Sequence, residues 1–211
     1  MSFAVVVDST CDFTQEEYKA LDVHMVPLSV LIDGETFKDQ VEITSEQFYE
    51  RMANSEGLPQ SSQPTPYDFE QMYNALAEQS YEGVIAIHIA GVLSGTIESS
   101  RTAAEQVDID VRVLDGARAG ATASVALAVA EICKMRDEGA TLDEAEAKVK
   151  ELLAKAEFLV APETLENLLK GGRLSADQVK NASLLNIKPI FTFNEKGILM
   201  AYGKAKGMRG V

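Results

Sequence analysis

The sequence predicts an α/β fold in which a mainly parallel sheet carries helices on both faces and is followed by a partial second α/β domain. Over the first three-quarters of the 211 residues, short apolar runs of the buried-strand type alternate with segments of helical periodicity. Polar loops follow three of those runs: Asp8-Ser9-Thr10, Ser94-Gly95-Thr96 and Asp115-Gly116. Because ligands of parallel sheets bind outside the carboxyl ends of the strands, these loops are expected to converge on one edge.

The N-terminal elements begin with an apolar run at 3–7 that is typical of a buried parallel strand. Capping boxes at 14–17 and 44–47 indicate the starts of two helices. Between them, residues 24–32 alternate as a strand does and then enter a hairpin turn. After a proline-flanked turn at 59–66, a further helix carries apolar residues at helical spacing: Phe69, Met72, Tyr73 and Leu76.

The middle of the chain continues this alternation. Strands are expected at 84–89, 111–114 and 158–161. Helices are expected at 95–107, in a long alanine-rich segment that ends at about residue 138, and in a segment that begins at 141. The stretch at 117–135 is apolar, but Arg118 and Glu131 interrupt it and alanine dominates it. It is therefore expected to form a buried helix and not a membrane span.

The pattern changes after residue 162. A short helix is expected at 163–170, followed by the turn Gly171-Gly172-Arg173-Leu174-Ser175 into another helical stretch and by a hairpin within 187–202. A segment of about 50 residues is small for an independent core. We therefore predict an N-terminal α/β domain at 1–162 and the start of a second, incomplete α/β domain at 163–211.

Composition restricts the classes of function. The net charge of −14 disfavours nucleic-acid binding, since only Lys204, Lys206 and Arg209 form a short basic group. The first residues lack a secretory signal, and Cys11 and Cys133 are too few for a disulfide framework, so a cytoplasmic location is expected. The two histidines of the chain cannot form a histidine-based metal cluster, and we predict neither a metal nor a cofactor.

Two hydroxyl-rich turns form the candidate site: Ser61-Ser62-Gln63-Pro64-Thr65 and Val92-Leu93-Ser94-Gly95-Thr96. Each is expected to open a helix, where unpaired N–H groups and a partial positive charge favour an anion. Serine and threonine hydroxyls there can donate further hydrogen bonds without adding a full charge. The sequence therefore predicts a site for an anionic head group such as a carboxylate or a phosphate.

Each part of this site also has a simpler interpretation. Alone, Ser94-Gly95-Thr96 is more often a capped strand-to-helix turn, and 61–65 is as readily a turn stabilised by proline. Arg173 alone is more often a solvated turn residue. Ser94 also stands one place too late after Gly91 for the G-x-S-x-G motif of a hydrolase, so a catalytic serine is not expected.

Two further polar residues are expected to be structural. His88 lies within an apolar strand and is interpreted as a core histidine with satisfied hydrogen bonds. Asp8 follows a strand, but Thr10 stands where a second aspartate would be needed for phosphoryl transfer. Asp8 is therefore expected to cap or orient Ser9 and Thr10.

Six short motifs occur in order along nearly the whole chain. They are Asp8-Ser9-Thr10, Val26-Pro27-Leu28, Ser62-Gln63-Pro64, Leu93-Ser94-Gly95-Thr96, Asp115 after a strand, and Gly171-Gly172-Arg173-Leu174-Ser175. No single motif is specific, but in this order they resemble the DegV family of fatty-acid-binding proteins. The resemblance implies two domains with a fatty acid in a tunnel between them.

The resemblance also implies a function. The chain would bind a long-chain (C14–C18) fatty acid and present its carboxylate to a separate fatty acid kinase subunit, which makes an acyl phosphate. It would itself be a non-catalytic, cytoplasmic lipid-binding protein without stable membrane insertion. Carried over by position, Ser62 and Ser94 are expected to bind the carboxylate directly. The other implied carboxylate-binding residues are Ser61, Gly95, Thr96 and, as the cationic partner, Arg173.

Two departures from the family pattern bear on these expectations. Ala90-Gly91 stands where the family usually has a pair of hydroxyl residues, so one donor is expected to be lost. The family's chains are also longer and carry a histidine near the head group, whereas no histidine follows His88 here. We therefore expect either a chain truncated at its C-terminus or a partner that completes the second domain.

Two other classes of function stay open on the sequence. An enzyme could act on a phosphorylated or carboxylated metabolite at the same loops, which requires turnover without a partner and a pocket too short for a lipid tail. A protein without a ligand could act through an interaction surface, and fatty acid would then add no thermal stability. No residue pattern specifies the chain length, the unsaturation or the oligomeric state.

Overall fold

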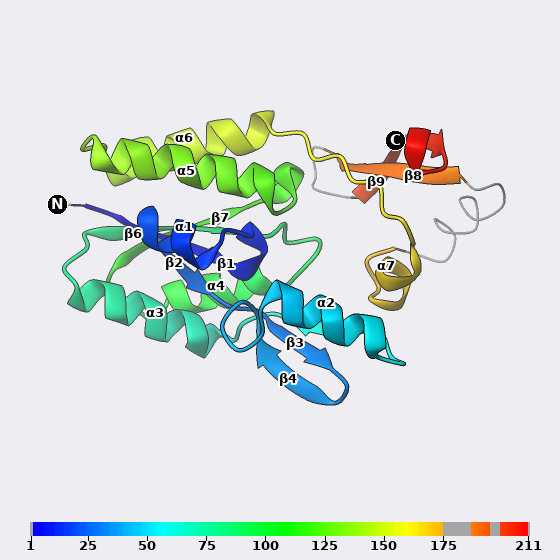
Figure 1. Cartoon of the computed structure of the whole chain (residues 1–211). Coiled ribbons are helices and arrows are strands. Elements are labelled where there is room, and N and C mark those ends of the chain that lie inside the picture. Colours follow the sequence, from blue (N-terminus) through cyan, green and yellow to red (C-terminus); the bar gives the residue numbers. More distant parts are fainter. Residues whose placement is uncertain (1, 175–186, 195–198, 211) are drawn as a thin grey trace.

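The computed structural model describes residues 2–174, 187–194 and 199–210. Its centre is a parallel sheet of four strands in the order β2-β1-β6-β7 (Figure 1). These strands are β1 (Ala4–Asp8), β2 (Val23–Val26), β6 (Gly83–His88) and β7 (Asp110–Asp115). The predicted α/β class with a parallel sheet is confirmed.

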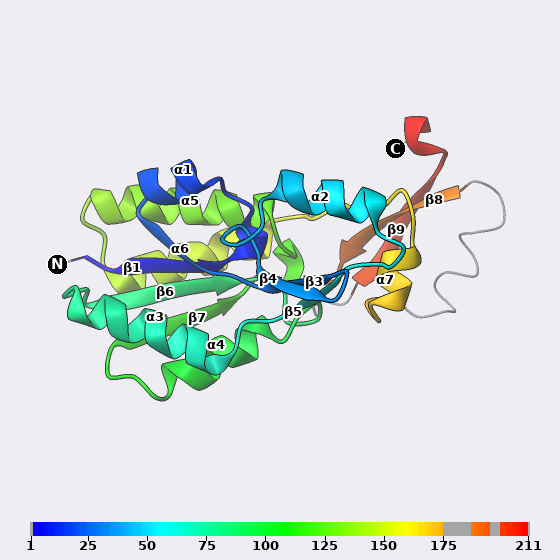
Figure 2. The same cartoon turned by 60° about the horizontal axis from the view of Figure 1, so that its bottom comes forward.

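Helices cover both faces of this sheet, as predicted (Figures 1 and 2). One face carries α1 (Gln15–Ala20), α5 (Ala123–Asp137) and α6 (Leu142–Lys155), and the other carries α3 (Pro66–Glu78) and α4 (Thr96–Ala104). The period-two alternation of β1 produces the two layers, because Val5 and Val7 belong to the core with α5 and α6, whereas Val6 belongs to the core with α3. Each fully buried aliphatic side chain stabilises this arrangement by roughly 1.5–3 kcal/mol.

Threonine capping boxes begin four of the described helices. Thr14, Thr44 and Thr141 each accept a hydrogen bond from the N–H three residues on and receive the reciprocal side-chain bond, which confirms the predicted starts of α1, α2 (Ser45–Asn54) and α6. Thr65 does the same at the start of α3. These starts follow from local chemistry alone, which is why the sequence predicts them well.

The alanine-rich stretch becomes helical later than its composition indicates. Gly120 and Thr122 have φ angles of 71° and 52°, so α5 starts only at Ala123, after a short 3-10 turn at Ala117–Ala119. Likewise α4 ends at Ala104 and not at residue 107. None of the described helices is both long and apolar enough to cross a membrane.

A small antiparallel sheet projects from the carboxyl edge of the parallel sheet, with the order β4-β3-β5. Its strands are β3 (Ser29–Ile32), β4 (Glu35–Lys38) and β5 (Gln60–Ser62), and β3 and β4 form the predicted hairpin. The single strand predicted at 24–32 is wrong. Pro27 separates β2 from β3, which lie in different sheets, because proline has no N–H to continue a ladder.

The prediction that the turn at 61–65 opens a helix is correct only for Thr65. Ser61 and Ser62 pair with Val30 and Ser29 of β3, and so belong to a strand. Their hydroxyls therefore do not lie at a helix N-terminus. The pairing with β3 is a tertiary contact, and the three-residue strand is too short to show a period in the sequence.

The C-terminal part holds α7 (Glu166–Lys170) and the hairpin of β8 (Ile187–Phe193) and β9 (Leu199–Lys206), which confirms the predicted helix and hairpin. The strand predicted at 158–161 is wrong, since only Val160 forms an isolated bridge, with Phe191. The hairpin turn, Ser175 and the helical stretch predicted after it lie outside the described residues. The domain division at residue 162 stays a prediction.

Candidate functional site

A hydroxyl-rich cavity of about 890 Å³ lies at the carboxyl edge of the parallel sheet, and we call it the hydroxyl pocket. Thr10 reaches it from the loop after β1, Ile89 and Ser94 from the segment after β6, and residues of α7 line another side. The described residues that line it are Thr10, Leu28, Gly57, Leu58, Pro59, Gln60, Ser61, Ser62, Gln63, Ile89, Leu93, Ser94, Asn167, Leu168, Lys170, Gly171 and Arg173.

The structure brings four of the six predicted site residues to this one cavity. Ser61 and Ser62 come from β5, Ser94 from the loop before α4, and Arg173 from the turn after α7. These segments are far apart in the sequence, and the fold alone places them together. Whether they bind a ligand stays a prediction.

The other two predicted residues, Gly95 and Thr96, do not line the cavity. Gly95 is the N-cap residue of α4, and Thr96 is fully buried. The Thr96 hydroxyl lies 2.8 Å from Ser94 Oγ, and the Thr96 N–H donates to that same Oγ at 3.3 Å. Thr96 thereby fixes the orientation of the Ser94 hydroxyl at the pocket wall.

Arg173 is exposed and lies against the loop that carries Ser94. Its Nε donates to the Leu93 carbonyl oxygen at 3.1 Å, and its Nη1 donates to the Gly171 carbonyl oxygen at 2.6 Å. These two bonds hold a permanent positive charge beside Ser94. The glycine-rich turn thus orients the guanidinium toward the pocket.

A buried carboxylate, Asp8, supports the floor of the pocket. Its Oδ1 accepts hydrogen bonds from the Thr10 N–H (2.9 Å) and hydroxyl (2.5 Å), and its Oδ2 accepts one from the Ile89 N–H (2.9 Å). Burial raises the pKa of Asp8, but nearby His88 and these hydrogen bonds outweigh it and hold the pKa below its usual value. Asp8 therefore stays ionised at neutral pH, and its predicted orienting role toward Thr10 is confirmed.

A chain of buried polar groups continues behind this floor. His88 Nδ1 lies 3.3 Å from Asp8 Oδ2, its Nε2 lies 2.8 Å from Ser100 Oγ, and that hydroxyl lies 2.6 Å from the Tyr73 hydroxyl. The order aspartate–histidine–serine imitates a hydrolase triad, but Ser100 is fully buried in the α3–α4 layer and cannot meet a substrate. His88 is a core histidine, as predicted, and its Nε2 is bonded to Ser100, but its Nδ1 has no hydrogen-bond partner among the described residues. The expectation of satisfied hydrogen bonds is therefore met at only one of the two ring nitrogens. Ser100 and Tyr73 have no signal in the sequence beyond helical spacing.

The third predicted loop, Asp115-Gly116, stabilises a neighbouring loop. Asp115 Oδ1 accepts from the Gly91 N–H at 3.0 Å and from the Ala117 N–H at 2.7 Å. Asp115 thus braces the loop that leads to Ser94, without lining the hydroxyl pocket in the described part of the chain. The three loops meet at the same edge of the sheet, as expected, but only the loops after β1 and β6 line the hydroxyl pocket.

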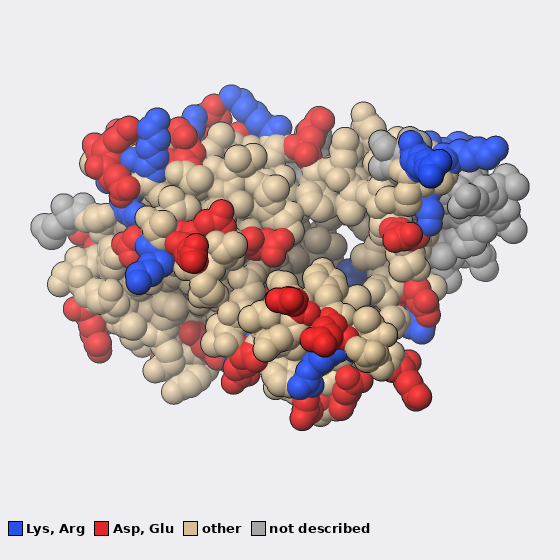
Figure 3. Space-filling model, in the orientation of Figure 1, with Lys and Arg blue, Asp and Glu red and all other residues tan. Residues whose placement is uncertain are grey.

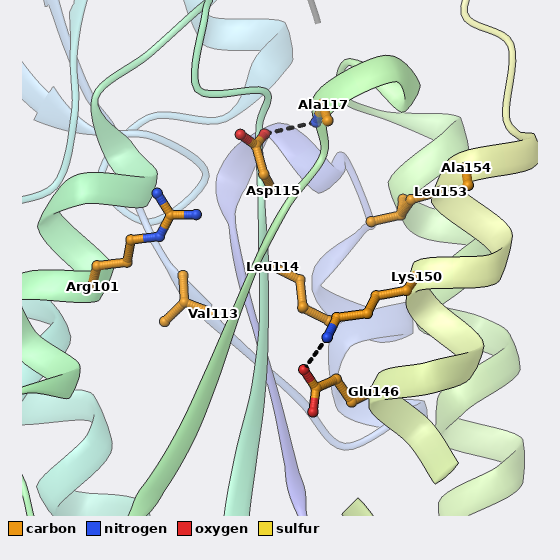
Figure 4. Close-up of a pocket in the computed structure, with 9 residues that line it drawn as sticks. All are labelled: Arg101, Val113, Leu114, Asp115, Ala117, Glu146, Lys150, Leu153 and Ala154. Carbon is orange, nitrogen blue, oxygen red and sulfur yellow. Dashed lines mark hydrogen bonds and ion pairs between the residues drawn. The ribbon is translucent and has the colours of Figure 1, made fainter. Parts of the chain in front are cut away.

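A second cavity, of about 650 Å³, lies along the edge strand β7 between α4 and α6 (Figure 4). Its charged lining residues are Arg101, Asp115, Glu146 and Lys150. Lys150 Nζ lies 2.5 Å from Glu146, and Arg101 Nη1 lies 2.7 Å from Glu98. With both signs of charge present and paired, this cavity does not select an anion.

Among the described residues, no group of three or more histidine, cysteine, aspartate or glutamate side chains is placed to hold a metal ion. The Cys11 and Cys133 thiols are both free and buried in the core. The chemistry that the hydroxyl pocket offers therefore comes from neutral hydroxyls, amides and two cations. Donors of these kinds can form hydrogen bonds to a carboxylate or a phosphate.

A model of the family described as "Uncharacterised protein, DegV family" matches residues 2–211 of the chain. A DegV domain-containing protein of Listeria innocua is 37% identical over 206 residues, which cover 93% of this chain and 69% of the relative. A DegV domain-containing protein of Streptococcus pyogenes is 38% identical over 187 residues, covering 88% of this chain and 66% of the relative. The chain thus spans about two thirds of the length of these curated relatives.

Solved structures resemble the chain over nearly its whole length. A DegV family protein from Thermus thermophilus, described by its fatty acid binding, superposes with a TM-score of 0.86 at 33% identity, covering 99% of this chain and 73% of that one. DegV of Bacillus subtilis, a fatty acid binding protein, gives 0.87 at 29%, covering 99% and 73%. The fatty acid kinase B3 protein of Streptococcus pneumoniae, loaded with linoleic acid, gives 0.84 at 26%, covering 100% and 75%.

Proposed function

The chain belongs to the DegV family, and from this premise we propose that it binds a long-chain fatty acid, with the carboxylate held at the hydroxyl pocket for a separate kinase. The fatty acid binding of the Thermus thermophilus protein and the linoleic acid bound by the Streptococcus pneumoniae protein support the ligand class. The role of the second protein as part of a fatty acid kinase supports the partner. The chain's own pocket supports the place of the head group.

The observation that carries the proposal is the charge of the hydroxyl pocket. The chain has 33 acidic residues and a net charge of −14, and acidic side chains are spread over the face shown in Figure 3. Yet none of the described residues that line the pocket is acidic, whereas Lys170 and Arg173 are cationic. Lys170 is ion-paired with Glu166 at 2.7 Å, so Arg173, which is bonded to backbone oxygens, is the main cation of the pocket. In a protein whose overall field repels anions, a concave surface of this kind is where a carboxylate is stabilised.

The same pocket offers apolar surface for the start of a tail. Its apolar lining residues are Leu28, Leu58, Pro59, Ile89, Leu93 and Leu168. Burial of a methylene is worth about 0.8 kcal/mol, so a dozen methylenes supply roughly 10 kcal/mol before ordering costs. The tail therefore provides most of the affinity, and the hydroxyls provide the orientation of the carboxylate.

A head-group site of neutral hydroxyls suits transfer to a kinase. A carboxylate oxygen would attack the terminal phosphorus of ATP held by the partner, giving an acyl phosphate and ADP. A fully buried ion pair would hold the carboxylate away from the partner, whereas exposed Ser62 and Arg173 leave it accessible. We therefore assign this chain a non-catalytic role. We place it in the cytoplasm, where free thiols such as Cys11 persist.

Native mass spectrometry of the purified chain, with solvent extraction of its ligand, tests the proposal. We expect a bound mass that corresponds to a C14–C18 fatty acid, or uptake of added palmitate by delipidated protein with a rise in the melting temperature. A protein that neither carries nor takes up a fatty acid would overturn the proposal. Turnover of a small phosphorylated metabolite without a partner would instead support an enzyme at the same loops.

A further inference from the structure

We propose that Gln63 is a positioning residue that sets the distance between the two hydroxyl-bearing segments of the pocket; this inference rests on the proposed function. Gln63 follows Ser62 at the end of β5, and its side chain crosses to α4, where Nε2 donates to Ser99 Oγ at 3.0 Å. Ser99 is buried within α4, five positions after Ser94. One amide therefore connects the strand that carries Ser62 to the helix that follows Ser94.

Gly95 makes room for this amide. A Cβ at position 95 would lie 2.8 Å from Gln63 Cδ and 2.9 Å from Nε2, and it would overlap Oε1. The φ angle of Gly95 is −75°, which any residue adopts, so backbone strain is not the reason for glycine here. The reason is contact: the Gln63 amide lies directly on the backbone between Ser94 and Thr96.

The contact matters because β5 and β6 belong to different sheets. β5 pairs with β3 in the small antiparallel sheet, whereas β6 pairs with β1 and β7 in the parallel sheet. The ladder of either sheet therefore leaves the spacing between Ser62 and Ser94 undetermined. The Gln63 amide, bonded to Ser99 and packed on Gly95, links β5 to α4 and to the loop that leads into it.

The proline at position 64 helps to direct this side chain. Pro64 is buried, and a residue that precedes proline is confined to extended backbone conformations. Gln63 thereby continues the direction of β5, and its amide reaches α4 instead of turning back. Each residue of the Ser62-Gln63-Pro64 motif thus has its own role. Ser62 carries the pocket hydroxyl, Gln63 bonds β5 to α4, and Pro64 directs the Gln63 side chain.

The experiment measures binding of myristate and of 1-tetradecanol to delipidated protein carrying Gln63→Ala, Ser99→Ala, Gly95→Ala and the pairwise combinations with Gln63→Ala. We expect each single variant to bind myristate about fivefold more weakly, the value of one net hydrogen bond. Binding of 1-tetradecanol, which shares the tail but lacks the carboxylate, should stay unchanged. In the Gln63→Ala background, Gly95→Ala and Ser99→Ala should have no further effect.

The control is Gln79→Ala, which removes an exposed amide that donates to the Ala75 carbonyl oxygen at the far end of α3. It should leave both ligands unaffected. Equal losses for myristate and 1-tetradecanol, or fully additive effects of the pairs, would overturn the positioning role. A loss in Gln63→Ala without one in Ser99→Ala would make Gln63 a direct ligand contact and also overturn it. Failure of the unaltered protein to bind myristate would refute the proposed function instead.

Discussion

The floor and the rim of the hydroxyl pocket differ in burial and in what their polar groups contact. The floor, formed by Asp8, Thr10 and Ile89, rests on a buried carboxylate whose oxygens accept three hydrogen bonds from within the protein. The rim, formed by Ser61, Ser62 and Arg173, is exposed to solvent. We therefore expect the floor to fix the shape of the site, and the rim to offer the donors that a ligand's carboxylate would bind.

Asp8→Ala should have the largest effect. The substitution leaves the Thr10 and Ile89 N–H groups without their acceptor and removes the carboxylate beside His88 in a buried region, so the free energy of unfolding should fall by about 3–5 kcal/mol. Urea unfolding measures this. Asp115→Ala is the matched control, because Asp115 also follows a strand and accepts two backbone N–H bonds but is only half-buried. It should cost about 1–2 kcal/mol. Equal losses would mean that burial does not distinguish the floor.

The acid dependence of stability should be the next largest effect. The folded-state pKa of Asp8 lies below its usual value of 3.8, so its contribution is fully present above pH 3.8 and is lost as the pH falls through the folded-state pKa. Asp8→Asn should show a shallower loss of stability than the unaltered protein as the pH falls below 3.8. Urea unfolding at a series of pH values measures the difference. Parallel curves for the two proteins would show that Asp8 titrates alike in the folded and unfolded states.

Arg173→Ala should affect the rim and spare the fold. An exposed cation contributes up to about 1 kcal/mol to an ion pair, so myristate should bind no more than about fivefold more weakly. With a bacterial fatty acid kinase and ATP supplied, the rate of ADP release should fall by more than the affinity does. Arg173 is bonded to Leu93, next to Ser94, and in the proposed function it orients the carboxylate there. Lys188→Ala, which removes a half-buried cation that is also bonded to a backbone oxygen (of Glu163), provides the control. A rate that falls only as far as the affinity would assign Arg173 to binding alone.

The contrast between floor and rim also explains how far the sequence can predict this site. Thr14, Thr44 and Thr141 act within their own helix turns, so the sequence shows the helix starts directly. The ordered motifs of the sequence include Ser94 and Arg173, because their neighbours along the chain carry the pattern. They do not include Ser100, since its partners lie 12 and 27 positions away and only the packed α3–α4 layer joins them.

Ser62→Ala should have the smallest effect and is the strictest test of the comparison. Ser62 lies on an exposed three-residue strand, so the free energy of unfolding should change by less than about 0.5 kcal/mol. Myristate binding should weaken by about 0.5–1 kcal/mol, because water replaces a single exposed hydroxyl at little cost. The control is Ser29→Ala, since Ser29 of β3 is the residue that pairs with Ser62 of β5; this variant should leave myristate binding unchanged. If Ser62→Ala lowered the free energy of unfolding by as much as it weakened myristate binding, Ser62 would stabilise the fold as the floor residues do. The distinction between floor and rim would then not hold for Ser62.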